Sequence, residues 1–267
     1  MPYVFCPKCN HRPLPANQAF PATCPGCGVI FAKLGEHIAG EPPRQAVSAA
    51  TDHLEEAQKD PAREGIPAML LHVPDQVDRL NWYGRMGTLA VFLLWTFFIW
   101  RDMDIAGGNA GSGFLHLILT PFHEAGHYLI FRWFGQFIMI LGGTMGQHLF
   151  AIVLGVALLW KRRDPFGAAI FLWVLGFSVS DMGVYMYDAF DPQLMLLDGR
   201  TGADSDGHDW QNIFGDLGLL KRARGIGIFF GGFGKVVMLA GLAWGAWMLW
   251  LQKARLSDSP SAETDLE

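Results

Sequence analysis

Apolar residues of this chain gather between Met86 and Leu251, whereas residues before about 80 and after 252 are mostly polar. Five runs with little or no charge lie in the apolar region, at residues 86–100, 113–134, 133–160, 166–187 and 225–251. A helix needs about 20 apolar residues to cross a bilayer core of roughly 30 Å. The first run is shorter, but Arg85 and Arg101 can extend it by snorkelling. The pattern predicts a mainly α-helical, polytopic membrane bundle with about five spans.

Three of the runs contain residues that can modify a regular helix. Thr120 and Pro121 suit a helix start, so we expect the second run to break there. The segment 141–144 (Leu-Gly-Gly-Thr) is a candidate for irregular backbone that lines a site. Glycines in the last run allow close helix contact, and we interpret them as packing residues; they are Gly227, Gly231, Gly241 and Gly245.

The composition is that of a membrane protein. Hydrophobic residues make up 51% of the chain and charged residues only 17%, which does not suit a single soluble domain. The net charge of −5 provides no basic surface, so we expect no nucleic acid partner. The N-terminus shows no basic region followed by an apolar core. We therefore expect internal segments to direct insertion, into a bacterial cytoplasmic membrane.

All four cysteines lie near the N-terminus, in two Cys-x-x-Cys pairs, Cys6 with Cys9 and Cys24 with Cys27. Two such pairs can place four thiolates around one structural zinc ion. Disulfides within the pairs would close very small loops and stabilise little, and no βαβ pattern supports a redox role. The spacing predicts a zinc ribbon at residues 1–34, whose folding energy comes from the metal. Its thiols require a reducing compartment, so we expect a cytoplasmic ribbon that docks a protein partner.

The rest of the chain divides by its polarity. Residues 35–80 are expected to form a flexible linker and a membrane-approach segment, 81–252 the membrane metalloprotease-like domain, and 253–267 a disordered tail. Lys and Arg residues are almost balanced between the two sides, so charge does not set the orientation. With the ribbon inside, five spans leave the basic residues 161–163 outside, where they have no explanation.

The most informative motif is His-Glu-Ala-Gly-His at residues 123–127, within an otherwise uncharged stretch. On a helix, His123 and His127 share one face, so both imidazoles can bind one zinc ion. Glu124 then lies beside the metal, where a carboxylate can take a proton from water. Chance gives such a motif in roughly one chain of this composition in a hundred, and less often in apolar surroundings.

The segment 123–135 (His-Glu-Ala-Gly-His-Tyr-Leu-Ile-Phe-Arg-Trp-Phe-Gly) resembles the active-site helix of site-2-protease-type intramembrane zinc metalloproteases. The downstream segment 141–143 is similar to the glycine-containing stretch of that family. The resemblance implies a membrane zinc peptidase in which Asp198, within Leu-Asp-Gly at 197–199, is the third zinc ligand. This chain departs from the pattern, because in the family Leu-Asp-Gly opens a membrane helix, whereas here a polar loop follows.

The third ligand is therefore expected in the loop between the fourth and fifth runs. A catalytic zinc takes three protein ligands and leaves one position for water. We predict that His208 or Asp209 is this ligand, because the apolar residues after Asp209 can hold the pair at the membrane surface. The other of the two would orient it. The alternatives are Asp198, or a plain loop histidine followed by Asp209 as helix N-cap.

Other polar residues in the apolar region have more than one candidate role. Asp181 is expected to orient a ligand or to pair with Lys235. Gln147 and His148 have the chemistry to bond substrate backbone, although helix packing explains them equally well. His116 is more typical of a hydrogen-bonded core histidine than of a metal ligand.

These observations predict a membrane-embedded zinc metalloendopeptidase that cleaves membrane-spanning or membrane-proximal polypeptides. It would hold one catalytic zinc, with Glu124 as the catalytic base, and one structural zinc in the ribbon. The alternative is a catalytically silent membrane adaptor that binds zinc and docks a protein through its ribbon. Glu124 favours the enzyme, since a structural site requires no general base. A metal transporter fits less well, because paired repeats are absent from the sequence.

Overall fold

The computed structural model describes residues 3–14, 18, 22–31 and 65–256. The chain forms two compact units, Met1–Arg63 and Glu64–Glu267. The expected linker up to residue 64 and the tail from 257 lie outside the described residues. In the first unit, the described residues form turns and one isolated antiparallel bridge between Thr23 and Ile30. The ribbon fold therefore stays a prediction, whereas its cysteine cluster is present.

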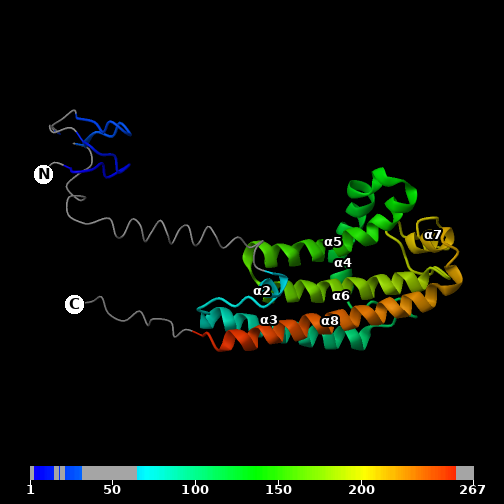
Figure 1. Cartoon of the computed structure of the whole chain (residues 1–267). Coiled ribbons are helices and arrows are strands. Elements are labelled where there is room, and N and C mark those ends of the chain that lie inside the picture. Colours follow the sequence, from blue (N-terminus) through cyan, green and yellow to red (C-terminus); the bar gives the residue numbers. More distant parts are fainter. Residues whose placement is uncertain (1–2, 15–17, 19–21, 32–64, 257–267) are drawn as a thin grey trace. The chain divides into compact units, whose positions relative to one another are not determined.

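The second unit is helical, as the hydrophobic pattern predicts (Figure 1). Its α-helices are α2 (Ile66–Leu70), α3 (Arg79–Asp102), α4 (Gly113–Ala125), α5 (Gln136–Arg162), α6 (Pro165–Asp188), α7 (Asp209–Asp216) and α8 (Ala223–Lys253). A π-helical turn η3 (Gly126–Ile130) and a 3₁₀ turn η4 (Arg132–Phe134) connect α4 to α5. Another 3₁₀ turn, η5 (Leu220–Arg222), precedes α8. Asp78 caps α3 by accepting the Asn81 N–H at 2.9 Å, so this helix begins before the first apolar run.

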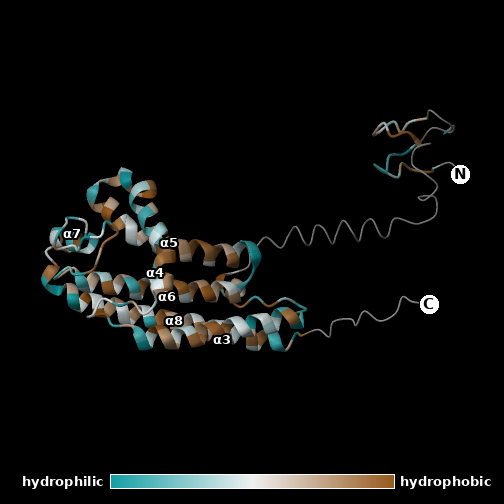
Figure 2. Cartoon of the chain, turned by 180° about the vertical axis from the view of Figure 1, so that it is seen from behind, coloured by the Kyte–Doolittle hydropathy of each residue, from teal (hydrophilic) through white to brown (hydrophobic). Residues whose placement is uncertain are grey.

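Among the residues that the structure describes, four helical segments are long and apolar enough to cross a membrane: α3, α5, α6 and Leu220–Lys253, which contains α8. Large apolar side chains are exposed along three of them, for example Leu94 on α3, Val153 on α5 and Phe229 on α8. Brown colouring dominates these helices in Figure 2. Such an apolar surface is expected where lipid, not water, surrounds the protein. The chain is thus a membrane protein by the length and composition of its helices.

Five spans were expected, and the second of them is not a span among the described residues. Helix α4 has 13 residues and measures about 20 Å, which is too short to cross the bilayer core. Pro121 lies inside α4 and does not start a helix, and the hydroxyl of Thr120 bonds the His116 carbonyl at 2.8 Å. The segment 141–144, expected to be irregular, is regular helix within α5.

The span count also changes the position of the basic residues 161–163. At one end of the bundle, Arg85 at the start of α3 pairs with Asp164 in the α5–α6 turn at 3.2 Å. There too, the Trp82 indole donates to the Leu249 carbonyl near the end of α8 at 3.0 Å. The start of α3, the α5–α6 turn and the end of α8 therefore lie together. The expectation that residues 161–163 face the opposite side from the start of α3 is wrong, because Arg85 contacts Asp164 directly after these residues.

Helix α6 forms the centre of the bundle and packs closely on α8. A Cβ at Gly183 would collide with backbone atoms of Gly227 and Gly231, and one at Gly241 would meet the Ala169 carbonyl. These three α8 glycines are confirmed as packing residues, whereas Gly245 has ordinary contact distances. Further along the interface the core contains fully buried side chains, namely Trp173, Phe177 and Met238. This rigid pair provides the wall against which the candidate site is built.

Candidate functional site

His123 and His127 lie at the end of α4, where the α-helix changes into the π turn η3. Their Nε2 atoms are 3.0 Å apart, so the two imidazoles converge as their spacing predicts. The close approach of α5 fixes this geometry, because Gly126 lies directly against the backbone of Gly142. A π turn is rare and occurs preferentially at functional sites.

Hydrogen bonds on the far side of each ring turn both Nε2 atoms toward one point. His127 donates its Nδ1–H to the Met139 carbonyl at 2.8 Å. His123 Nδ1 lies 3.2 Å from Gln147 Oε1, and Gln147 Nε2 in turn donates to the Ser178 carbonyl and hydroxyl. Because that carbonyl only accepts, the Gln147 oxygen faces His123 and accepts its proton. Both Nε2 lone pairs are left for a metal, and Gln147 orients the His123 ring.

Asp209, the first residue of α7, completes a triangle with the two histidines. Its Oδ2 lies 2.9 Å from His123 Nε2 and 3.2 Å from His127 Nε2. Ligand atoms around a tetrahedral zinc with bonds of 2.0–2.1 Å are about 3.3 Å apart, so this donor set fits a zinc ion. The ionised carboxylate is the form of Asp209 that would bind a metal ion.

The structure does not bring His208 to the histidines. His208 is fully buried and caps α7, because its Nδ1 accepts the Gln211 N–H at 3.1 Å. Its Nε2 lies 3.2 Å from Asp188 Oδ2, so both ring nitrogens are occupied. The N-cap of α7 is thus His208. The alternative in which His208 is an ordinary loop residue and Asp209 caps the helix is wrong. Of the predicted pair, Asp209 has the geometry of a third ligand, a role that stays a prediction.

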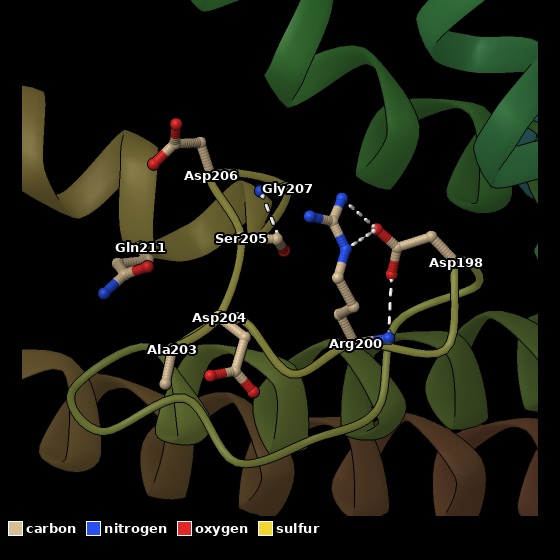
Figure 3. A pocket seen from close by; sticks show the side chains of 9 residues that line it. Asp198, Arg200, Ala203, Asp204, Ser205, Asp206, Gly207 and Gln211 are labelled. Carbon is tan, nitrogen blue, oxygen red and sulfur yellow. Dashed lines mark hydrogen bonds and ion pairs between the residues drawn. The ribbon is translucent and has the colours of Figure 1, made fainter.

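Asp198, the ligand that the family resemblance implies, lies in an exposed loop (Figure 3). Its carboxylate pairs with the Arg200 guanidinium at 2.7 Å and accepts the Arg200 backbone N–H at 3.0 Å. These contacts lower its pKa. It lines an open polar cavity of about 690 Å³ that also includes Asp204, Ser205 and Gln211. In the described structure Asp198 is engaged with Arg200 and bonds neither histidine.

Glu124 is half-buried next to the histidines. One carboxylate oxygen of Glu124 and one ring nitrogen each of His123 and His127 all lie within 4.8 Å of one another. A carboxylate at this distance can exchange a proton with a water beside the metal. The metal-binding chemistry predicted for residues 123–127 is therefore assembled in space.

Gly143 on α5 provides the room for this site. A Cβ there would collide with Nε2 of His127 and come within 2.6 Å of Nε2 of His123. The sequence pattern predicts irregular backbone at Gly143. In the structure, Gly143 lies in a regular helix that approaches the two imidazole Nε2 atoms so closely that only glycine fits.

We expect Gly143→Ala to lower zinc occupancy at this site by at least tenfold, because the methyl group displaces both ligand atoms. The measurement is the zinc content of the purified protein at buffered free zinc. Gly155→Ala is the matched control, since Gly155 lies on the same helix with only ordinary contact distances. Equal zinc content in the two variants would contradict the assigned geometry.

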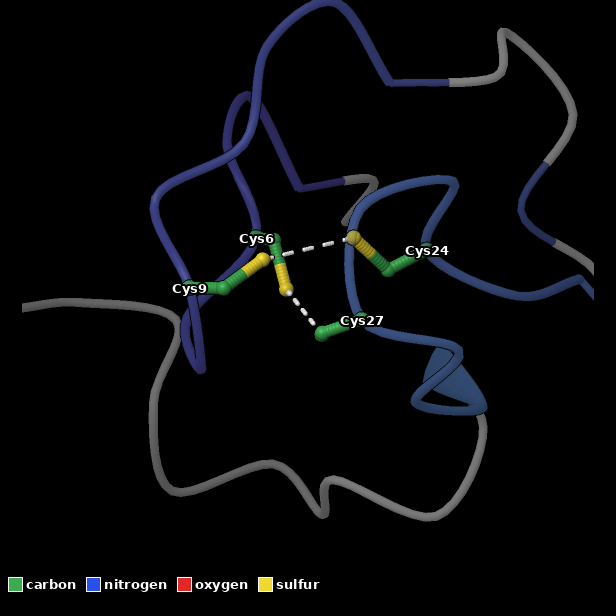
Figure 4. Close-up of side chains that lie close together, drawn as sticks. All are labelled: Cys6, Cys9, Cys24 and Cys27. Carbon is green, nitrogen blue, oxygen red and sulfur yellow. Dashed lines mark hydrogen bonds between the residues drawn. The ribbon is translucent and has the colours of Figure 1, made fainter.

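The cysteine cluster is a second candidate metal site (Figure 4). Sγ of Cys6 lies 3.7 Å from that of Cys27, and Sγ of Cys9 lies 3.6 Å from that of Cys24. Tetrahedral zinc with bonds of about 2.3 Å places sulfur atoms about 3.8 Å apart, so the cluster fits a zinc ion. All four thiols are free, which leaves the alternative of two disulfides without support.

We expect two zinc ions per chain, one at each site. Elemental analysis should give about two equivalents, and Cys6→Ser with Cys9→Ser should reduce this to about one, because two thiolates no longer bind a metal. A single equivalent that survives the cysteine changes and disappears in His123→Ala would exclude the ribbon site.

The contacts of other intramembrane polar residues agree with some of their expected roles and not with others. Asp181 bonds His116 Nδ1 through both oxygens, at 2.9 and 3.1 Å, and does not pair with Lys235. Lys235 lies over the Trp100 ring at 5.8 Å. His116 is hydrogen-bonded as expected, but its side chain is 57% exposed and thus no core residue. His148 bonds the Thr144 carbonyl of its own helix.

Tyr185 also contributes to the candidate site, although the sequence pattern did not identify it. The Tyr185 hydroxyl accepts the Asp209 backbone N–H at 3.1 Å, and its ring centroid lies 6.4 Å from that of His123. The available signal was the spacing of Tyr185 and Asp188, which are three residues apart and share a helix face.

Comparisons with models of known families, with curated proteins and with solved structures find no match for this chain. The likeness to site-2-protease-type enzymes therefore depends on the residues of segments 123–135 and 141–143 alone. It carries a proposal about function and not a family assignment.

Proposed function

We propose that this protein is a membrane-embedded zinc metalloendopeptidase. The observation that carries the proposal is the convergence of Asp209 Oδ2 on the Nε2 atoms of His123 and His127, with the Glu124 carboxylate beside them. Three protein ligands leave a fourth tetrahedral position for water, which is the arrangement of catalytic zinc. A closed structural site would need no neighbouring base.

The residues divide the chemistry among them. His123, His127 and Asp209 would hold the zinc, which when bound acts as a Lewis acid toward water and a peptide carbonyl. Glu124 accepts the proton of the attacking water and then returns it to the leaving amine. Gln147 and the Met139 carbonyl keep the imidazoles oriented.

The depth of the site supports a polypeptide substrate at the membrane. Along α5, Gly143 and Lys161 are separated by about 27 Å at 1.5 Å per residue. The site therefore lies near the bilayer face opposite the basic α5–α6 turn, given a hydrocarbon core of roughly 30 Å. A scissile bond within a span, close to that face, or just outside it would reach the metal. We propose the ribbon as a docking module for a protein partner.

The proposal can be tested with purified protein in lipid vesicles and a fluorescently labelled, single-span polypeptide set with varied residues near each membrane face. We expect zinc-dependent cleavage products that carry new N-termini in or near the span, detected by mass spectrometry. Removal of zinc with a chelator should stop cleavage, and added zinc should restore it. Absence of cleavage for every substrate, with zinc bound at the histidines, would contradict the enzyme and leave the adaptor alternative.

A further inference from the structure

Helix α7 is attached at its first turn to the last turn of α6. Tyr185 and Asp188 share one face of α6. Each forms a hydrogen bond with one of two consecutive residues, Asp209 and His208. The Tyr185 hydroxyl accepts the Asp209 backbone N–H at 3.1 Å. Asp188 Oδ2 lies 3.2 Å from His208 Nε2. Asp209 is thus held in place through its own backbone N–H and through the side chain of the preceding residue, His208.

His208 is held on every side. Its ring centroid lies 4.2 Å from that of Tyr185, and its Nδ1 accepts the Gln211 N–H. Because Nδ1 accepts a hydrogen bond, the ring proton is on Nε2, which donates a hydrogen bond to the Asp188 carboxylate. On the opposite side Gly202 packs so closely that a Cβ there would come within 2.8 Å of His208 Cβ. No ring nitrogen of His208 remains for a metal in this arrangement.

Asp188 also anchors the chain that leaves α6. Its Oδ1 accepts the Gln193 N–H at 2.9 Å, and its Oδ2 accepts the Leu194 N–H at 3.1 Å. One carboxylate therefore holds both the beginning of the 189–208 loop and the residue at its end. The loop cannot shift at either end without losing bonds to Asp188.

We propose that Tyr185, Asp188 and His208 form a clasp that positions Asp209 as the third metal ligand. The proposal rests on the metal site of the proposed function. The clasp residues are positioning residues, because they act through Asp209 and not on the metal. Loss of one such partner typically lowers metal affinity 10- to 100-fold.

The test uses the full chain with Cys6→Ser and Cys9→Ser, so that the membrane site is measured alone. Tyr185→Phe removes one hydroxyl, and Tyr187→Phe on the same helix turn is the matched control. We expect zinc affinity, measured against graded chelators, to fall 10- to 100-fold in Tyr185→Phe and to stay unchanged in Tyr187→Phe. The visible spectrum of the cobalt-substituted protein should change only in Tyr185→Phe, which a purely structural role would not produce.

His208→Asn provides a second variant that does not depend on Tyr185. Asparagine can still cap α7 through its side-chain oxygen but is too short to reach Asp188. We expect it also to lower zinc affinity 10- to 100-fold and less than Asp209→Ala does. A loss as large as that of Asp209→Ala, with one fewer imidazole in the cobalt spectrum, would make His208 a ligand and overturn the clasp.

Failures of the two proposals give different results. Unchanged zinc affinity and cobalt spectra in both variants, with zinc bound in the parent chain, would overturn the clasp alone. Lack of any metal at the membrane site of the parent chain would remove the proposed function and the clasp together. Zinc binding that depends on the clasp, without cleavage of any polypeptide, would support the clasp and contradict the peptidase.

Discussion

Glu124→Gln should abolish peptide cleavage while zinc stays bound. Glutamine keeps the size of the side chain and cannot accept a proton, so only the acid–base step is lost. General acid–base catalysis contributes about 10²- to 10⁴-fold, and a rate reduction in this range is expected. The ligands His123, His127 and Asp209 are unchanged, so the zinc content should equal that of the original protein. Cleavage and zinc content are measured on the same preparation.

The two readouts separate three explanations. Retained cleavage in Glu124→Gln would contradict Glu124 as the base. Loss of zinc together with cleavage would make Glu124 a ligand, which its proximity to both histidines allows geometrically. Retained zinc with lost cleavage, in a variant of a parent chain that cleaves, is the expected result and would assign Glu124 as the base.

Asp209→Ala should remove zinc from the membrane site, whereas Asp198→Ala should leave it bound. Asp209 Oδ2 lies within 3.2 Å of both ligand nitrogens, while Asp198 is exposed and paired with Arg200. Loss of a direct ligand should cost more than the 10- to 100-fold typical of an outer partner. The measurement is zinc affinity in the chain with Cys6→Ser and Cys9→Ser.

Asp216→Ala is the control for changes on α7, because Asp216 is the exposed last residue of the same short helix. It should bind zinc like the parent chain. If Asp198→Ala loses zinc and Asp209→Ala does not, the arrangement implied by the family resemblance is correct, and the loop at 189–208 must adopt another conformation.

The parts of the site that sequence could predict are those set by local spacing. Two histidines four residues apart share a helix face, and two Cys-x-x-Cys pairs can surround one zinc, whatever the rest of the fold. The apolar runs likewise identify most of the membrane helices. In contrast, the length of a run does not show whether its helix crosses. In residues 113–134 the α-helix ends at Ala125 and becomes a π turn at Gly126–Ile130, where Gly126 lies against the backbone of Gly142 on another helix.

The choice between His208 and Asp209 needed the tertiary structure. The two residues are neighbours with the same chemistry toward zinc, and the sequence alone gives no reason to prefer one. The selection comes from Asp188 and Tyr185 on α6, which bind the His208 ring and the Asp209 backbone and so turn the Asp209 carboxylate toward the histidines. Gly143 illustrates the same limit, because its importance depends on a contact between helices.

X-ray absorption at the zinc edge tests the central claim most directly, on the full chain with Cys6→Ser and Cys9→Ser. A site made by His123, His127 and Asp209 should show two imidazole ligands and two oxygen ligands at about 2.0–2.1 Å, with no sulfur. Exchangeable solvent should supply one of the oxygens. Lack of zinc, or a closed shell of four protein ligands without solvent, would contradict a catalytic metal centre in this membrane protein.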